Sequence, residues 1–320
     1  MVKKLEEFEV KEKLIKSSLL GAIIGDIIGS RFEFNNHRSK DFRLFDSNCY
    51  FTDDTIMSIG IANVNAYIKK NINDKDFNFD HNEIVDMYKC SLTQSCMPYA
   101  DDYNASFGDM FRTWLKDRDK KPYHSYGNGC LSRIGSCFDM YGKDDAKELS
   151  DVYHLTFAAT AVTHDSKEAL DINFIFTKML YSIIKNPKKY KHYINNSMKE
   201  FDKKGFKLKF ANNIESDAIS LIDNNVFSLD DLSKLNIFDE TCFYTFPIAM
   251  KCVYEATGFE DAIRNAISIG GDSDTIAAIV GMVAAKIFGI PSNFVSVAVS
   301  YLNHEMLEDL FNVILCMENK

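Results

Sequence analysis

The sequence predicts an all-α protein that folds as a single domain. Its 320 residues include only 5 prolines and 15 glycines, so residues that interrupt secondary structure are scarce. Apolar residues recur at helical spacing in several long segments. Strict alternation of apolar and polar residues, which is typical of half-buried strands, is rare. No repeat or linker divides the chain, so we expect one folding unit.

Predicted helices follow one another along most of the chain. The charged residues 1–16 predict a short peripheral helix or arm, and the domain itself is expected to span 17–320. Residues 98–129 mix Asp, Asn, Gly and aromatic residues and predict an ordered loop region around one short helix. The polar region 185–240 is expected to be helical only in places. Helices are predicted over residues 19–30, 55–70, 83–97, 107–116, 144–162, 167–184, 275–288 and 293–315.

The first long helix has an unusual face. Gly21, Gly25 and Gly29 recur at every fourth position, which places them on one side where another backbone can approach closely. The run is too short for a membrane-spanning glycine motif, and Asp26 interrupts it. Asp26 fits a metal ligand and a structural carboxylate equally well.

Composition argues against several classes of function. The net charge of -9 disfavours a protein that binds nucleic acid through its phosphates. No segment approaches the roughly 18 consecutive apolar residues of a membrane helix, and the N-terminus lacks the apolar region of a signal peptide. The eight cysteines form no CxxC pair, which predicts free thiols in a reducing cytoplasm. We expect a cytoplasmic monomer.

Two acidic clusters at opposite ends of the sequence carry the main functional signal. The first is Thr52-Asp53-Asp54-Thr55, and residues 270–275 form the second with the sequence GGDSDT. Both clusters precede an apolar, helix-like segment. Asp53 or Asp54 could simply cap the 55–70 helix, because side-chain oxygens satisfy free N–H groups at a helix start.

The combination of the two clusters nevertheless suggests a metal site. Carboxylates at the end of a buried helix are costly unless they are neutralised. If the clusters meet in the fold, four carboxylates converge, and hard divalent cations such as Mg²⁺ prefer several oxygen ligands of this kind. The residues alone therefore predict a site for one or two metal ions.

Several motifs together resemble the ADP-ribosylglycohydrolase family, which includes the hydrolase that reactivates dinitrogenase reductase and the eukaryotic ADP-ribosyl-acceptor hydrolases. They occur in the family's order and span residues 19–291. One departure is Ser132, where the family usually has Met. The matching blocks are residues 25–33 (GDIIGSRFE), 51–55 (FTDDT), 125–129 (SYGNG) with Arg133, 163–164 (TH) and 270–278 (GGDSDTIAA).

This resemblance implies a roughly orthogonal helix bundle with a binuclear Mg²⁺ or Mn²⁺ centre. In matching positions, Thr52, Asp53 and Asp54 would bind one ion. Asp272 and Thr275 would bind the other ion, and Asp274 would bridge the two.

The same resemblance assigns the remaining site residues. Glu33 matches a mobile glutamate that closes over the metals in some members, so Glu33 and a ligating Asp (Asp53, Asp54 or Asp274) are the expected proton carriers. His164 would lie near the substrate diphosphate. Arg133 is expected to pair with a buried carboxylate, and Phe107, Phe111 or Tyr126 could stack on adenine. The residues expected to hold the diphosphate are Ser125, Tyr126, Gly127, Asn128 and Gly129.

The resulting hypothesis is a metal-dependent hydrolase that releases ADP-ribose from a modified acceptor, an arginine or serine side chain. Two alternatives stay open. One is a protein of the same fold that binds ADP-ribose or neutralises a toxin without catalysis. The other is a hydrolase of a small ADP-ribosyl metabolite. The choice between Mg²⁺ and Mn²⁺ is also open, because both accept the same oxygen ligands.

Overall fold

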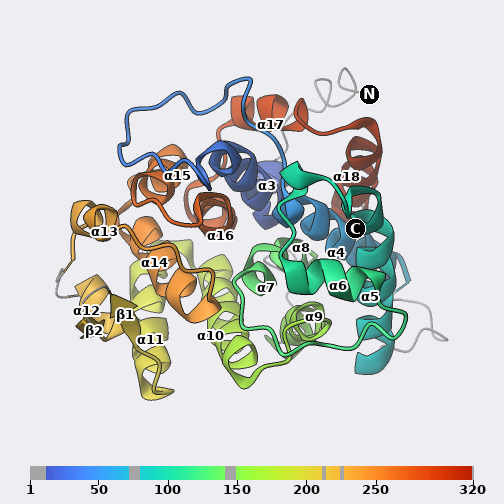
Figure 1. Ribbon diagram of the computed structural model, residues 1–320, viewed down its shortest axis with the longest axis horizontal. Coiled ribbons are helices and arrows are strands. Elements are labelled where there is room, and N and C mark those ends of the chain that lie inside the picture. Colours follow the sequence, from blue (N-terminus) through green and yellow to red (C-terminus); the bar gives the residue numbers. More distant parts are fainter. Residues whose placement is uncertain (1–11, 72–79, 141–148, 211–213, 224–226, 319–320) are drawn as a thin grey trace.

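The computed structural model describes residues 12–71, 80–140, 149–210, 214–223 and 227–318. Within these residues the protein is an assembly of helices with one two-stranded antiparallel sheet (Figure 1). The all-α prediction is therefore confirmed. Residues 1–11 of the predicted arm lie outside the described residues, and its remainder includes a short helix.

The helices of the N-terminal half are coloured from blue to green in Figure 1. They are α2 (Glu12–Ile15), α3 (Ser18–Gly29), η1 (Ser30–Phe32), α4 (Asp53–Asn71), α5 (His81–Cys96), η2 (Met97–Tyr99), η3 (Tyr103–Ala105), α6 (Asp109–Lys116), α7 (Gly129–Ser132), α8 (Gly135–Asp139) and α9 (Leu149–Ala161).

The C-terminal half contains the small sheet, in which Leu208 pairs with Ser216 and Phe210 with Ile214. Its elements are α10 (Lys167–Lys185), η4 (Pro187–Lys189), α11 (Tyr190–Lys203), β1 (Leu208–Phe210), β2 (Ile214–Ser216), α12 (Ala218–Asp223), α13 (Leu229–Leu235), α14 (Cys242–Glu255), α15 (Phe259–Ser268), α16 (Ser273–Phe288), α17 (Ser292–Val299) and α18 (His304–Glu318).

The closest helix pair joins the two ends of the sequence. Helix α16 lies near the centre of the molecule, beside α3, α14 and α15 (Figure 1). Its backbone packs directly on the glycine face of α3. A Cβ added to Gly25 would overlap the Ala277 carbonyl, and one added to Gly29 would lie 2.5 Å from the Cα of Asp274. The close approach expected from the glycine spacing is therefore confirmed.

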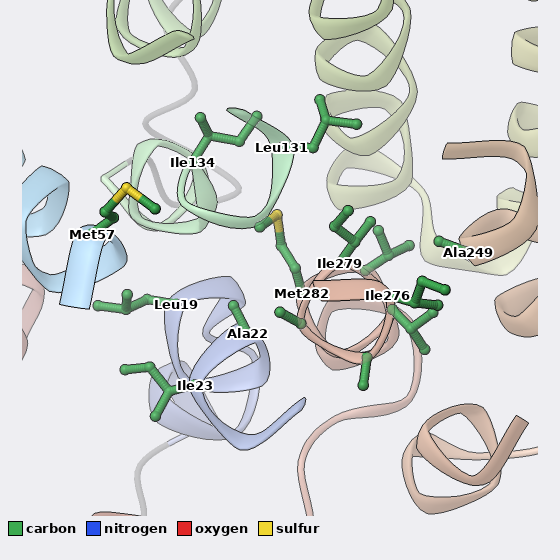
Figure 2. Close-up of a cluster of buried hydrophobic side chains, with 14 of the residues drawn as sticks. Leu19, Ala22, Ile23, Met57, Leu131, Ile134, Ala249, Ile276, Ile279 and Met282 are labelled. Carbon is green, nitrogen blue, oxygen red and sulfur yellow. The ribbon is translucent and has the colours of Figure 1, made fainter. Parts of the chain in front are cut away.

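Buried apolar side chains surround this contact (Figure 2). They come from elements that are far apart in the sequence, so one continuous core holds both acidic clusters. The residues labelled in Figure 2 are Leu19, Ala22 and Ile23 of α3, Met57 of α4, Leu131 of α7, Ile134, Ala249 of α14, and Ile276, Ile279 and Met282 of α16.

The N-terminus of α3 is fixed by Asp139, at the end of α8. Its carboxylate accepts hydrogen bonds from the backbone N–H groups of Ser18 (2.8 Å) and Leu19 (2.9 Å). Lys286 of α16 forms an ion pair with the same carboxylate, and its Nζ lies 2.5 Å from Oδ1. A carboxylate at a helix N-terminus is favourable because it meets free N–H groups and the positive end of the dipole. This interaction fixes α3 and α16 at the end opposite the acidic clusters.

Two details differ from the sequence predictions. Helix α4 begins at Asp53, so neither Asp53 nor Asp54 is its cap; the Thr52 hydroxyl accepts from the Asp54 N–H at 3.4 Å. The predicted 293–315 helix is two helices, α17 and α18, because Asn303 caps a new start by accepting from the Met306 N–H. The polar region 185–240 is helical in places, as predicted: it contains η4, α11, α12 and α13, together with the strands β1 and β2.

The structure also bears on the predicted absence of membrane segments and disulfides. Among the described residues, no helix combines the length and apolar character needed to cross a membrane. All eight cysteines are free thiols, and only Cys90 is exposed. The prediction of unpaired cysteines is therefore confirmed.

We predict that Gly25→Ala lowers the free energy of unfolding by about 2–3 kcal/mol, because the new methyl group must push α3 away from the Ala277 carbonyl. Denaturant unfolding followed by circular dichroism measures this change. Gly129→Ala is the matched control, since a Cβ at Gly129 meets nothing within 4 Å. Equal stabilities of the two variants would contradict the proposed close contact.

Candidate functional site

Asp26 of α3 fixes the start of α4. Its buried carboxylate accepts hydrogen bonds from the backbone N–H groups of Thr52 (3.0 Å) and Thr55 (3.2 Å). It also accepts from both threonine hydroxyls, that of Thr52 at 2.6 Å. Hydrogen bonds to a charged acceptor are stronger than neutral ones. The first acidic cluster is therefore held against α3 by a carboxylate that acts as a cap from a neighbouring helix.

The two acidic clusters meet in the fold. One ligand atom each from Asp26, Asp54 and Asp274 lies within 4.8 Å of the other two. The same is true of Glu33, Asp272 and Asp274. All five side chains are buried, and Asp274 belongs to both groups. The site therefore consists of two carboxylate groups with one shared member.

The other predicted ligands border these groups. Asp53 belongs to neither group, and its side chain is half-buried. Loss of hydration and the charges of Asp54 and Asp26 together raise the Asp53 pKa well above its usual value. The Thr275 side chain is buried and lies near enough to Asp54 to oppose in part the rise of the Asp54 pKa. Thr52 is fully buried, and its hydroxyl donates to Asp26. Each predicted ligand thus lies in or beside the carboxylate cluster.

The carboxylates of this cluster are strongly perturbed. Burial is the largest cause in each case, because it disfavours the charged form. Burial and the nearby Asp26 charge raise the pKa of Asp54 to about 7. Burial and Asp272 raise the pKa of Glu33 to about 8. Burial, followed by the Asp272 charge, raises the pKa of Asp274 well above its usual value.

Two oxygen atoms in the cluster lack partners. Asp54 Oδ2 and Asp274 Oδ1 are buried and accept no hydrogen bond from the described residues. The other oxygen of Asp54 accepts from the Ser132 hydroxyl. A buried polar atom without a partner is costly. Unpartnered oxygens beside further carboxylates and hydroxyls match the chemistry of a hard divalent cation, which requires several oxygen ligands.

Two residues that the sequence pattern did not indicate, Asn36 and Ser106, hold Glu33 beside the second acidic cluster. Ser106 donates a hydrogen bond to Glu33 Oε2 at 3.1 Å. The Asn36 amide donates to the Glu33 carbonyl and to the Gly271 carbonyl, each at 2.9 Å, and accepts from the Gly271 N–H at 2.8 Å. Gly271 has φ +81°, a conformation that favours glycine. Asn36 therefore joins the Glu33 segment to the turn that carries Asp272.

The predicted phosphate loop reaches the same cluster through Asn128. The Asn128 amide donates to Asp272 Oδ2 at 2.6 Å. Two backbone donors of this loop already have partners within the protein: the Gly127 N–H binds Ser125 Oγ (3.1 Å) and the Asn128 N–H binds the Glu240 carbonyl (2.7 Å). These two N–H groups are therefore engaged within the protein, contrary to the simplest picture of a backbone cradle.

Tyr126 and Gly129 complete this loop. The Tyr126 carbonyl accepts from the Cys242 N–H at 2.9 Å, which ties the loop to the start of α14. Its side chain is 53% exposed. Gly129 begins α7, and the space around its Cα is open. The loop thus presents an exposed aromatic ring and an open backbone surface beside the carboxylates.

His164 lies against this loop. The ring is buried, and its Nδ1 lies 2.7 Å from Thr163 Oγ1. Its Nε2 faces Gly127, because a Cβ added to Gly127 would lie 3.4 Å from that atom. Burial and then the positive charge of Arg133 lower the His164 pKa well below its usual value. The imidazole is therefore neutral at physiological pH.

The structure corrects two side-chain expectations. Phe107 and Phe111 are buried, with 3% and 5% exposure, and stack on each other, so neither is available to adenine. Tyr126 stays available. The exposed pair Phe34 and Phe238, with ring centroids 6.3 Å apart, was not anticipated.

Arg133 does not pair with a carboxylate. Its fully buried guanidinium donates to the Ala159 carbonyl through Nε (3.1 Å) and Nη2 (2.6 Å), and Nη2 also donates to Thr163 Oγ1 (2.8 Å). The end of α9 presents free carbonyl groups there, and these can accept from a cation. The sequence pattern does not show that the end of α9 lies beside the Arg133 guanidinium.

Comparison with known proteins identifies the family of this chain. A model of the ADP-ribosylglycohydrolase family matches residues 9–313. The chain belongs to the ADP-ribosylglycohydrolase family. A solved structure described as an ADP-ribosylglycohydrolase-related protein complex has the same fold, with TM-score 0.53 and 17% identity over 96% of this chain and 98% of that one. A search of curated proteins finds no match.

We predict that the protein becomes less stable as pH rises from 5 to 8 in the presence of a chelator. Carboxylates whose folded-state pKa is raised bind more protons in the folded than in the unfolded chain above the ordinary pKa of about 4. Their contribution is lost as pH rises through their folded-state values, by on the order of 2 kcal/mol.

Thermal unfolding in chelator across this pH range measures the effect. Asp274→Asn removes one member of the cluster and should flatten the dependence. A melting temperature that rises steadily to pH 8, or an identical slope in the variant, would contradict the coupling of these carboxylates.

Proposed function

We propose that this chain is a metal-dependent hydrolase that releases ADP-ribose from a modified protein side chain, an arginine or a serine. The observation that carries the proposal is the pair of carboxylate groups that share Asp274, together with the two buried oxygens that lack a partner. Membership of the ADP-ribosylglycohydrolase family supports the ADP-ribosyl linkage as the bond that is cleaved.

Two Mg²⁺ or Mn²⁺ ions fit the donor set. They would neutralise the carboxylates and act as Lewis acids toward the hydroxyl groups of the distal ribose. Asp26 is fully engaged by threonine donors, so we assign it a supporting role. The residues proposed to hold the ions are Thr52, Asp53 and Asp54 for one and Asp272 and Thr275 for the other, with Asp274 shared.

The remaining residues would bind and orient the substrate. Asn128, fixed by Asp272, and His164 lie where the loop 125–129 faces the carboxylates. We propose that they receive the diphosphate, with the exposed Tyr126 ring available to stack on adenine. Glu33 belongs to the second carboxylate group, with Asp272 and Asp274, and accepts a hydrogen bond from Ser106. It is placed to move a proton when the acceptor leaves the anomeric carbon.

The test is release of free ADP-ribose from arginine-linked and serine-linked peptides, each with Mg²⁺, with Mn²⁺ and with chelator. Metal-dependent release from either peptide supports the proposal and identifies the linkage. If neither peptide is cleaved while ADP-ribose binds tightly, the proposal fails and a binding protein is favoured. Cleavage of a small ADP-ribosyl metabolite alone would favour that substrate class instead.

We predict that Asp54→Asn and Asp274→Asn each lower kcat/KM by at least about 100-fold, equivalent to about 2.7 kcal/mol of transition-state stabilisation. Both changes keep the side-chain shape but remove a charged ligand. Asp86→Asn is the control, because Asp86 is an exposed partner of Lys89 on α5. Retained activity in the two site variants, with folding confirmed by circular dichroism, would rule out this ligand assignment.

A further inference from the structure

A chain of three polar side chains runs from the buried end of α9 to the candidate phosphate loop. Arg133 donates to Thr163 Oγ1 at 2.8 Å, and Thr163 Oγ1 lies 2.7 Å from His164 Nδ1. All three side chains are buried. Of the three side chains, His164 is the one that faces the loop, because its Nε2 lies near Gly127. The chain therefore connects a fixed cation to a ring at the substrate surface.

The direction of each hydrogen bond follows from the donors. A guanidinium has no acceptor, so Thr163 Oγ1 must accept from Arg133. The Thr163 hydroxyl then has its own hydrogen to donate, and His164 Nδ1 is within reach at 2.7 Å. A hydrogen on Nδ1 would point the positive end of the N–H dipole toward the nearby positive charge of Arg133, which is unfavourable. Both considerations favour Nδ1 as the acceptor.

The Tyr123 ring lies beside His164. Its ring centroid is 6.1 Å from that of His164, and the two ring planes are tilted by 52°. The Tyr123 backbone N–H donates to the Thr163 carbonyl at 3.3 Å, so this contact leaves the Thr163 hydroxyl hydrogen available to His164.

A neutral imidazole carries its single hydrogen on the nitrogen that is not accepting. If Nδ1 accepts, Nε2 is the donor, and it faces the loop beside Gly127. No described residue accepts a hydrogen bond from His164 Nε2. The N–H groups of Gly127 and Asn128 are already engaged by Ser125 Oγ and the Glu240 carbonyl. His164 therefore supplies a donor where these two backbone donors are occupied.

We propose that Arg133 and Thr163 are positioning residues that hold His164 as its Nε2–H tautomer, so that the ring donates a hydrogen bond to a phosphate oxygen of the substrate. The identity of this ligand rests on the proposed function, whereas the tautomer rests on the contacts of Arg133 and Thr163 alone. A donor fixed before binding avoids the free-energy cost of reorienting the group when substrate arrives.

Imidazole ¹⁵N spectra of the wild-type protein test the tautomer directly, with His164→Gln used to assign the signal among the 7 histidines. We expect Nδ1 to give an unprotonated signal and Nε2 a protonated one. Addition of ADP-ribose should shift the Nε2 signal. A wild-type protein that carries the hydrogen on Nδ1 would overturn the proposal without any variant.

Thr163→Val removes the hydroxyl at nearly constant shape. We expect a mixed tautomer signal and about tenfold weaker binding of ADP-ribose, as measured by calorimetry, since one hydrogen bond to a charged group loses its orientation. Thr163→Ser should restore both properties. Tyr123→Phe changes a ring beside His164 but keeps the Arg133–Thr163–His164 contacts, and it should leave the tautomer unchanged.

Two results distinguish this inference from the proposed function. Unchanged tautomer and unchanged ADP-ribose affinity in a folded Thr163→Val variant would overturn the positioning role, even if the enzyme hydrolyses its peptide. A wild-type protein that binds ADP-ribose through an Nε2–H donor but cleaves neither peptide would support the inference while the proposed hydrolysis fails.

Discussion

The backbone contact between α3 and α16 is the constraint on which the rest of the structure depends. The glycine face of α3 brings the backbone of Ala277 and Asp274 within direct contact. Asp26, on the same helix, then receives the first turn of α4 through Thr52 and Thr55. Asp54 and Asp274 meet because both helix starts are fixed relative to α3.

The site buries several carboxylates, which destabilises the folded state, within an apolar core that stabilises it. Burial of several carboxylates opposes folding, and their raised pKa values record this cost. The apolar packing around α16 compensates for it (Figure 2). Function and stability therefore conflict at this cluster, and a bound cation is the simplest way to relieve the conflict. Ser132 reduces the conflict in part, because its hydroxyl satisfies one oxygen of Asp54.

The sequence predicts those features of the fold that depend on local patterns of residues, such as the glycine spacing of α3. The spacing of Gly21 and Gly25 predicted a backbone contact, and the acidic clusters were expected to meet. It could not show that Asn36 and Ser106 hold Glu33, because these contacts join segments through irregular loops. Which groups a buried polar side chain contacts likewise depends on where distant helices end, and the sequence pattern does not give this.

Arg133 and Phe107 illustrate the same limit at the level of single side chains. The expected carboxylate partner of Arg133 was wrong because the guanidinium instead donates to the Ala159 carbonyl near the end of α9 and to the Thr163 hydroxyl. The expected adenine contact of Phe107 was wrong because the ring packs into the core with Phe111. Sequence pattern identifies the residue types of a site, but burial decides which of them can reach a ligand.

The number of Mn²⁺ ions bound per chain, measured by equilibrium dialysis with elemental analysis, tests the central claim most directly. The two carboxylate groups share Asp274, so we predict two ions in the wild-type protein and loss of both in Asp274→Ala. One ion or none in the wild-type protein, or loss of a single ion in the variant, would contradict a two-ion site built around a shared aspartate.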